Sequence, residues 1–189
     1  ENLPFTGCSF MVVTLIGYRG CGKTTVAAPL AARLGWNWCD ADDEIERAAG
    51  KSIRDIFADD GEPRFRELES RVLAELLAKD RLVLAAGGGA VLDAGTRRRM
   101  KNAGPVVWLR AGVDRLETRI GADRTTAERR PNLTSTGGRE EIEKMLTLRE
   151  PLYRECAGVV VETDDLSVDE VVDRVLAAVG ETVSRGGRP

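Results

Sequence analysis

The stretch MVVTLIGYRGCGKTTVAAPLAARLG, residues 11–35, decides the fold predicted from this sequence. It opens with MVVTLIG, a continuous apolar run of strand length, and ends with TTVAAPLAARLG, whose apolar residues have helical spacing before a closing glycine. Between them, Gly17, Gly22, Lys23 and Thr24 form the phosphate-loop (P-loop) motif G-x-x-x-x-G-K-T. Because this motif follows a strand and opens a helix, it predicts a binding site for a nucleoside triphosphate.

The residue types in the P-loop explain this prediction. Its glycines allow successive backbone N–H groups to turn inward around a phosphate, and the helix N-terminus adds partial positive charge. Lys23 is expected to face solvent in the empty loop and to span the β- and γ-phosphates of the nucleotide, while the Thr24 hydroxyl is offered to Mg²⁺. The residues predicted to hold the phosphates are Gly20, Cys21, Gly22, Lys23, Thr24 and Thr25.

Composition restricts the class of protein. The chain has 189 residues, 42% of them hydrophobic, which is enough for one domain with a core. The net charge of −3 provides no basic field for nucleic acid, and no apolar run approaches the length of a membrane span. The spacing of the cysteines predicts neither a zinc site nor a redox pair, and it indicates a reducing, cytoplasmic location; they are Cys8, Cys21, Cys39 and Cys156.

Strands and helices are predicted to alternate along one domain, residues 11–180. Residues 1–10 are interpreted as a tag or disordered lead, and 181–189 as a disordered tail. The pattern predicts a three-layer α/β/α fold with a parallel, five-stranded central sheet, as in P-loop kinases. Strands are expected at 11–17, 36–39, 81–89, 105–110 and 158–162, and helices at 24–35, 53–57, 67–77, 97–102, 113–120, 140–148 and 168–179. The long polar connection at 121–138 is typical of a mobile lid.

Two carboxylates are candidates for the metal and for proton transfer. The strand at 81–89 ends in glycines rather than in the aspartate that often supports Mg²⁺ in such folds. Asp40 and Asp42 lie two residues apart after another strand, and in an extended chain they would point to opposite sides, one toward the metal and one beyond it. The alternative is an acidic helix start, which explains Asp43 and Glu44 well. The chain contains no histidine, so Asp42 is the leading candidate for a general base.

Later motifs resemble those of the shikimate kinases. GYRGCGKTT, DADDEIE, SIRDIFADDGEPRFRELE, AAGGGAV, RRPNLT and LREPLYRE occur in the order and spacing of that family, from about Met11 to Gly180. The resemblance implies that Lys23 and Thr24 bind ATP and Mg²⁺, and that Asp40 supports the metal through water. It also implies that Asp42 contacts the ring hydroxyls of shikimate and takes the proton.

The resemblance implies an acceptor site formed by the region of about residues 42–78 together with residues further along the chain. Arg66 and Arg149 match the arginines that hold the shikimate carboxylate, a pairing that guanidinium geometry favours, and Glu69 is placed to hold Arg66. The alternative for Arg66 is a solvated charge on a helix. The other residues matched to the acceptor side are Gly87, Gly88 and Gly89, a triplet costly in chain entropy unless backbone approaches a ligand closely, and the aromatic residues Phe57 and Phe65, which as isolated residues are more often core.

The resemblance also assigns arginines to the nucleotide. Arg130 matches the lid arginine that reaches the phosphates and acts in catalysis, and Arg119 is placed on the adenine side. The sequence Arg130-Pro131-Asn132 departs from the family pattern Arg-Pro-Leu, so Arg124 and Arg129 are alternatives for the lid arginine. Cys21 is either a redox-sensitive thiol or a small residue that fits the loop.

The function predicted from these observations is phosphorylation of the 3-hydroxyl of shikimate by ATP, in the pathway to chorismate and aromatic amino acids. An alternative is a kinase of another small hydroxy acid such as gluconate, which would be favoured if Arg66 and Arg149 did not converge. A further alternative is an ATP-dependent switch or binding module with no acceptor pocket. The protein is expected to act as a monomer, without nucleic acid or membrane partners.

Overall fold

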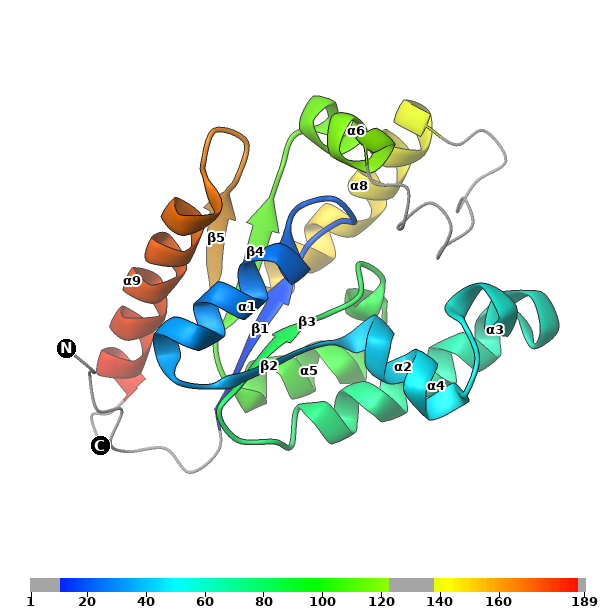
Figure 1. The fold of residues 1–189 in the computed structure, drawn as a ribbon, viewed down its shortest axis with the longest axis horizontal. Coiled ribbons are helices and arrows are strands. Elements are labelled where there is room, and N and C mark those ends of the chain that lie inside the picture. Colours follow the sequence, from blue (N-terminus) through cyan, green and yellow to red (C-terminus); the bar gives the residue numbers. More distant parts are fainter. Residues whose placement is uncertain (1–10, 123–137, 187–189) are drawn as a thin grey trace.

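The core of the protein is a parallel sheet (Figure 1). A computed structural model describes residues 11–122 and 138–186, with side chains as far as Gly180. The predicted five-stranded parallel α/β/α fold is confirmed, with the strand order β2-β3-β1-β4-β5. The strands are β1 (Val12–Ile16), β2 (Asn37–Asp40), β3 (Leu82–Ala85), β4 (Val106–Arg110) and β5 (Val159–Glu162).

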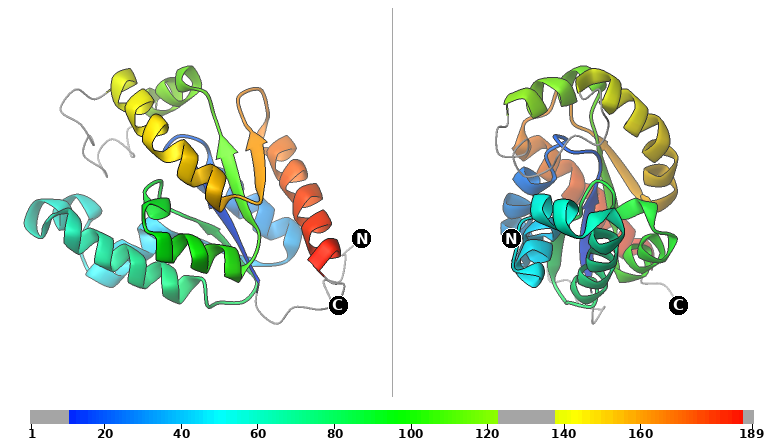
Figure 2. Two further views of the ribbon diagram at one scale, coloured as in Figure 1. Left: turned by 180° about the vertical axis from the view of Figure 1, so that it is seen from behind. Right: turned by 90° about the vertical axis from the view of Figure 1, so that its right-hand side faces the viewer.

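Helices cover both faces of this sheet (Figure 2). Side chains of β1 alternate: Val13 and Leu15 pack with α1 and α9, whereas Val12 and Ile16 pack with α4, α5 and the C-terminal half of α8. The helices are α1 (Lys23–Leu34), α2 (Ala41–Ala49), α3 (Ile53–Asp59), α4 (Gly61–Leu76), α5 (Ala94–Ala103), α6 (Val113–Ala122), α8 (Gly138–Cys156) and α9 (Val168–Gly186), with a 3₁₀ turn at Ala90–Leu92.

Several helices extend beyond their predicted limits, α4, α8 and α9 the furthest. α4 begins at Gly61 rather than at residue 67, because Pro63 lies in the first turn, where its missing N–H costs no helical hydrogen bond. α8 passes through Pro151 to Cys156, since Tyr153 and Cys156 beyond the proline are buried in the core. α9 continues to Gly186, inside the range predicted as a disordered tail, because no proline interrupts the sequence there.

Several strands end at the same edge of the sheet, and the predicted site residues follow them. The P-loop follows β1, Asp40 ends β2, and Gly87 comes two residues after β3. The region predicted to bind the acceptor forms α2, α3 and α4, which extend beyond this edge in Figure 1. The predicted lid and its arginines, Arg124, Arg129 and Arg130, lie outside the described residues. Within the described ranges, no helix is both long and apolar enough to cross a membrane.

Candidate active site

The P-loop connects β1 to α1 and adopts a backbone that requires glycine. Gly20 and Gly22 have φ of 80° and 96°, in the left-handed region that other residues rarely enter. Lys23 Nζ donates to the carbonyl oxygens of Gly17 at 2.8 Å and Tyr18 at 2.9 Å. The expectation of a solvent-facing lysine is therefore wrong, because the ammonium group finds acceptors within the loop itself.

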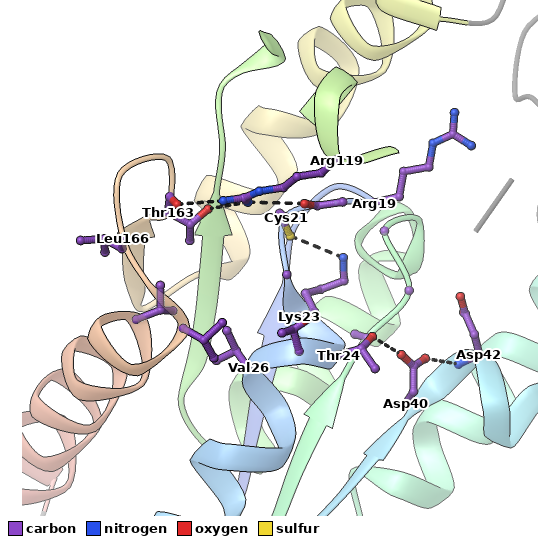
Figure 3. Close-up of a pocket in the computed structure, with 18 residues that line it drawn as sticks. Arg19, Cys21, Lys23, Thr24, Val26, Asp40, Asp42, Arg119, Thr163 and Leu166 are labelled. Carbon is purple, nitrogen blue, oxygen red and sulfur yellow. Dashed lines mark hydrogen bonds between the residues drawn. The ribbon is translucent and has the colours of Figure 1, made fainter. Parts of the chain in front are cut away.

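Thr24 and Asp40 form the polar end of the site (Figure 3). Thr24 Oγ1 donates to Asp40 Oδ2 at 2.6 Å, and Asp42 N donates to Asp40 Oδ1 at 2.9 Å. The predicted extended alternation of Asp40 and Asp42 is wrong: Asp40 caps α2, and Asp42 lies in its first turn. The acidic helix start and the site are thus the same feature of the sequence, and both carboxylates line one pocket.

The residues at this end fit Mg²⁺ bound together with phosphates. A hydroxyl and a carboxylate are hard oxygen ligands, and Mg²⁺ is usually held by one or two such groups, water and substrate phosphates. Among the described residues no group of three or more His, Cys, Asp or Glu side chains could hold a metal. Thr24 and Asp40 would support the ion together with the phosphates of a nucleotide.

The pKa of Asp40 is raised by its burial and, to a smaller extent, by the charge of Asp42. Asp40 therefore takes up a proton at a higher pH than an ordinary aspartate, and the protonated form cannot support Mg²⁺. We expect the Mg²⁺ concentration needed for ATP binding to rise as the pH falls, starting at a higher pH than the ordinary pKa of an aspartate would give. Asp42→Asn removes one cause of the raised Asp40 pKa. In this variant the rise in the required Mg²⁺ concentration should therefore begin at a lower pH. Calorimetric titrations of ATP at several Mg²⁺ concentrations would test this, and coincident pH profiles would contradict it.

On the acceptor side, two arginines from different helices contact one turn of the chain. Arg66 Nη1 donates to Glu69 Oε2 at 2.7 Å, the predicted contact, and Arg66 Nη2 donates to Glu62 at 3.0 Å. Arg149 is 7% exposed, and its Nη1 donates to the Gly88 carbonyl oxygen at 3.4 Å. A side chain at Gly89 would meet Arg66 Nη1 at 2.5 Å. The arginines therefore approach neighbouring residues, Gly88 and Gly89, and their convergence on one acceptor pocket stays a prediction.

The glycine triplet is explained in part by protein contacts. A Cβ at Gly88 would lie 3.4 Å from the Gly17 carbonyl oxygen and 3.6 Å from Arg19 N, both in the P-loop. The Gly88 carbonyl oxygen also accepts a 2.6 Å hydrogen bond from the Tyr153 hydroxyl. The contacts at Gly88 are ordinary van der Waals contacts, so only Gly89 is required by a close approach, that of the Arg66 guanidinium.

A pocket of about 450 Å³ joins the P-loop to the carboxylates. At its other end, Arg119 donates to the Thr163 carbonyl oxygen at 3.1 Å and to that of Gly20 at 3.5 Å, next to apolar side chains suited to a base. The lining residues are Arg19, Gly20, Cys21, Gly22, Lys23, Thr24, Thr25, Val26, Asp40, Asp42, Ala86, Gly87, Gly88, Arg119, Thr163, Leu166, Val168 and Val171.

Some predicted site residues lie outside this pocket. The lining does not include Arg66, Arg149 or Glu69, nor Phe57 and Phe65, whose rings stack with centroids 4.7 Å apart. Phe65 is 1% exposed and belongs to the core, and an acceptor role for Phe57 stays a prediction. Cys21 is 1% exposed, and this burial favours the interpretation as a small residue that fits the loop.

Sequence reasoning missed several residues of the site. Thr163, Leu166 and Val168 form the base-side wall, and their position after the last parallel strand could have indicated this. The ion pair of Arg19 with Glu141 joins residues too far apart in the sequence for any local pattern to reveal it.

The parallel sheet, the P-loop at its carboxyl edge and a pocket continuing to two aspartates define a P-loop kinase. The family profile described as shikimate kinase matches residues 19–180. The chain belongs to the shikimate kinase family.

Relatives and solved structures agree with this assignment. A shikimate kinase of Rhodopirellula baltica is 42% identical over 171 residues, covering 90% of this chain and 91% of that protein. A shikimate kinase of Frankia casuarinae is 43% identical, and the match covers 98% of this chain and 80% of that protein. The structure of shikimate kinase from Acinetobacter baumannii in complex with shikimate has a TM-score of 0.85 at 36% identity, covering 92% of this chain and 95% of that one. A gluconokinase from Sinorhizobium meliloti, at 16% identity and a TM-score of 0.59, shares the fold.

Proposed function

We propose that this protein transfers the γ-phosphoryl group of ATP to the 3-hydroxyl of shikimate, giving shikimate 3-phosphate and ADP for the synthesis of chorismate and aromatic amino acids. The observation that carries the proposal is the approach of Arg66 and Arg149 to neighbouring glycines, next to the pocket that holds Lys23 and Asp42. Two guanidinium groups at one turn suit an acceptor with a carboxylate.

The residues divide the reaction between them. Lys23 and the P-loop amides bind the β- and γ-phosphates and stabilise the charge of the transferring group. Asp42 lines the pocket where an acceptor hydroxyl would approach, and takes its proton. Thr24 and Asp40 would hold Mg²⁺, which would supply charge neutralisation at the phosphate oxygens. Arg130 is proposed as the lid arginine on family resemblance alone, since it lies outside the described residues.

Location and oligomeric state are also proposals. Use of ATP as phosphoryl donor supports a cytoplasmic location. A monomer is proposed because the residues that line the nucleotide pocket and those that hold the acceptor belong to one chain. Gel filtration with light scattering would test the monomer, and a stable dimer would contradict it.

The acceptor is tested by measuring ADP release with shikimate, gluconate and other small hydroxy acids. We expect turnover with shikimate to exceed that with the other acids. Turnover preferring gluconate would favour the alternative kinase, while ATP binding without turnover of any hydroxy acid would favour a switch or binding module.

Arg149→Lys tests the carboxylate contact. The substitution replaces a bidentate guanidinium with a point charge, so we expect the Kd for shikimate to rise about tenfold or more while the Kd for ATP stays nearly unchanged. Both constants can be measured by calorimetry.

The control is a carboxamide analogue of shikimate, which lacks the negative charge. It should bind the parent protein poorly and lose little further affinity in Arg149→Lys, because the interaction being removed is already absent. The four affinities form a double-mutant cycle with the carboxylate as the second change. A coupling energy of zero would place Arg149 outside the acceptor site.

A further inference from the structure

A buried ion pair joins the P-loop to α8. Arg19 Nη2 donates to Glu141 Oε1 at 2.8 Å, and the side chains are 14% and 0% exposed. Arg19 is a P-loop residue that lines the pocket, whereas Glu141 lies in the first turn of α8. Figure 3 shows the Arg19 side chain pointing away from Lys23 and Thr24. Its guanidinium is thus held by the helix.

The same helix contacts the P-loop and the glycine turn further along. The Arg149 guanidinium lies 5.9 Å from the centre of the Tyr18 ring, and Arg149 and Tyr153 both donate to the Gly88 carbonyl oxygen. Glu141, Arg149 and Tyr153 lie within one stripe of α8, given about 100° of rotation per residue. One face of α8 therefore contacts the P-loop at Tyr18 and Arg19, and it also donates hydrogen bonds to the glycine turn at Gly88.

Stability alone does not account for the pair. Burying a carboxylate removes it from water at a high cost in free energy, and an apolar pair of similar volume often stabilises a fold as well or better. A charged pair does provide a directional contact that fixes the relative position of two segments. Here the segment that is fixed precedes Gly20 and Gly22, whose left-handed backbone forms the phosphate cradle.

We propose that Glu141 is a positioning residue for nucleotide binding: it holds Arg19 and thereby fixes the P-loop against α8. The proposal rests on the proposed binding of ATP by this loop. Glu141 acts through Arg19 and touches no substrate. Its loss should therefore weaken the binding of ATP and ADP, which both carry the phosphate that the loop encloses, and should leave the acceptor side intact.

Calorimetry on the full chain tests this with Glu141→Gln, which keeps the size of the side chain but removes its charge. We expect the Kd values for ATP and ADP to rise about tenfold, which corresponds to about 1.4 kcal/mol of binding free energy. The Kd for shikimate without nucleotide should change less than about twofold. The matched control is Glu155→Gln, which removes the partner of Arg97 from the same helix, away from the pocket. It should alter neither affinity.

A double-mutant cycle separates positioning from direct contact. If Glu141 acts through Arg19, the double variant Arg19→Met with Glu141→Gln should bind ATP no more weakly than either single variant. Arg19→Lys keeps the charge, so it should recover most of the ATP affinity that Arg19→Met loses. If Glu141→Gln does not fold, Glu141→Asp, which keeps the charge but shortens the side chain, takes its place in the cycle with Arg19→Met.

Three results would overturn the proposal. Glu141→Gln could lower the melting temperature and leave the nucleotide affinity unchanged, or it could weaken the binding of ATP and of shikimate equally. The third result is a loss of ATP affinity in the double variant that equals the sum of the two single losses. A parent protein that binds no ATP would instead contradict the proposed function itself, so the two failures can be told apart.

Discussion

Lys23→Ala is expected to lower kcat by about 10³-fold or more while the protein remains folded. The ammonium group is the point charge that the P-loop offers to the transferring phosphate. Its hydrogen bonds to the Gly17 and Tyr18 carbonyl oxygens add a second effect, because their loss loosens the loop. The affinity for ATP should therefore fall as well. Steady-state ADP release and calorimetry would measure both losses, and circular dichroism would report the fold.

The control for Lys23→Ala is Lys101→Ala, which removes an exposed lysine from α5. It changes the net charge equally, so a long-range electrostatic effect would appear in both variants. We expect Lys101→Ala to keep the activity of the parent. Activity of Lys23→Ala within a few-fold of the parent would contradict the assignment of the phosphate site.

The sheet could be predicted because its strands are buried on both faces and so appear as continuous apolar runs. The run at residues 11–17 and the glycine-rich turn after it gave the correct strand, loop and helix. Helix limits were less predictable. α8 passes through Pro151 because distant core residues pack around Tyr153, and that packing has no local pattern in the sequence.

The site could be predicted where a motif fixes the backbone and not where a fold brings distant segments together. The P-loop and the position of Asp40 directly after the strand core follow from local patterns, although the turn into α2 at Ala41 placed Asp42 differently from an extended strand. The contact of Gly89 with Arg66 and the pair of Arg19 with Glu141 depend on the tertiary packing of α4 and α8. Only the structure shows that the Arg66 guanidinium occupies the space that Gly89 leaves.

Asp42→Asn is expected to lower kcat by about 10²-fold or more, with a much smaller effect on ATP binding. The substitution keeps the size of the side chain and the backbone N–H that donates to Asp40, but removes the basic carboxylate. Because the chain contains no histidine, no imidazole is available to take the proton of an acceptor hydroxyl. Turnover at saturating ATP and shikimate, together with calorimetric titration of ATP, would separate the two effects.

Two neighbouring aspartates provide the comparison for Asp42→Asn. Asp40→Asn should raise the Mg²⁺ concentration required for activity, because Asp40 is the carboxylate that contacts Thr24. Asp43→Asn, in the same helical turn but exposed and outside the pocket, should leave kcat and the Mg²⁺ requirement unchanged. If Asp40→Asn and Asp42→Asn showed the same metal dependence and the same loss of kcat, the division into a metal-supporting and a proton-accepting carboxylate would be wrong. A similar loss in Asp43→Asn would attribute the effect to the charge of the helix start instead.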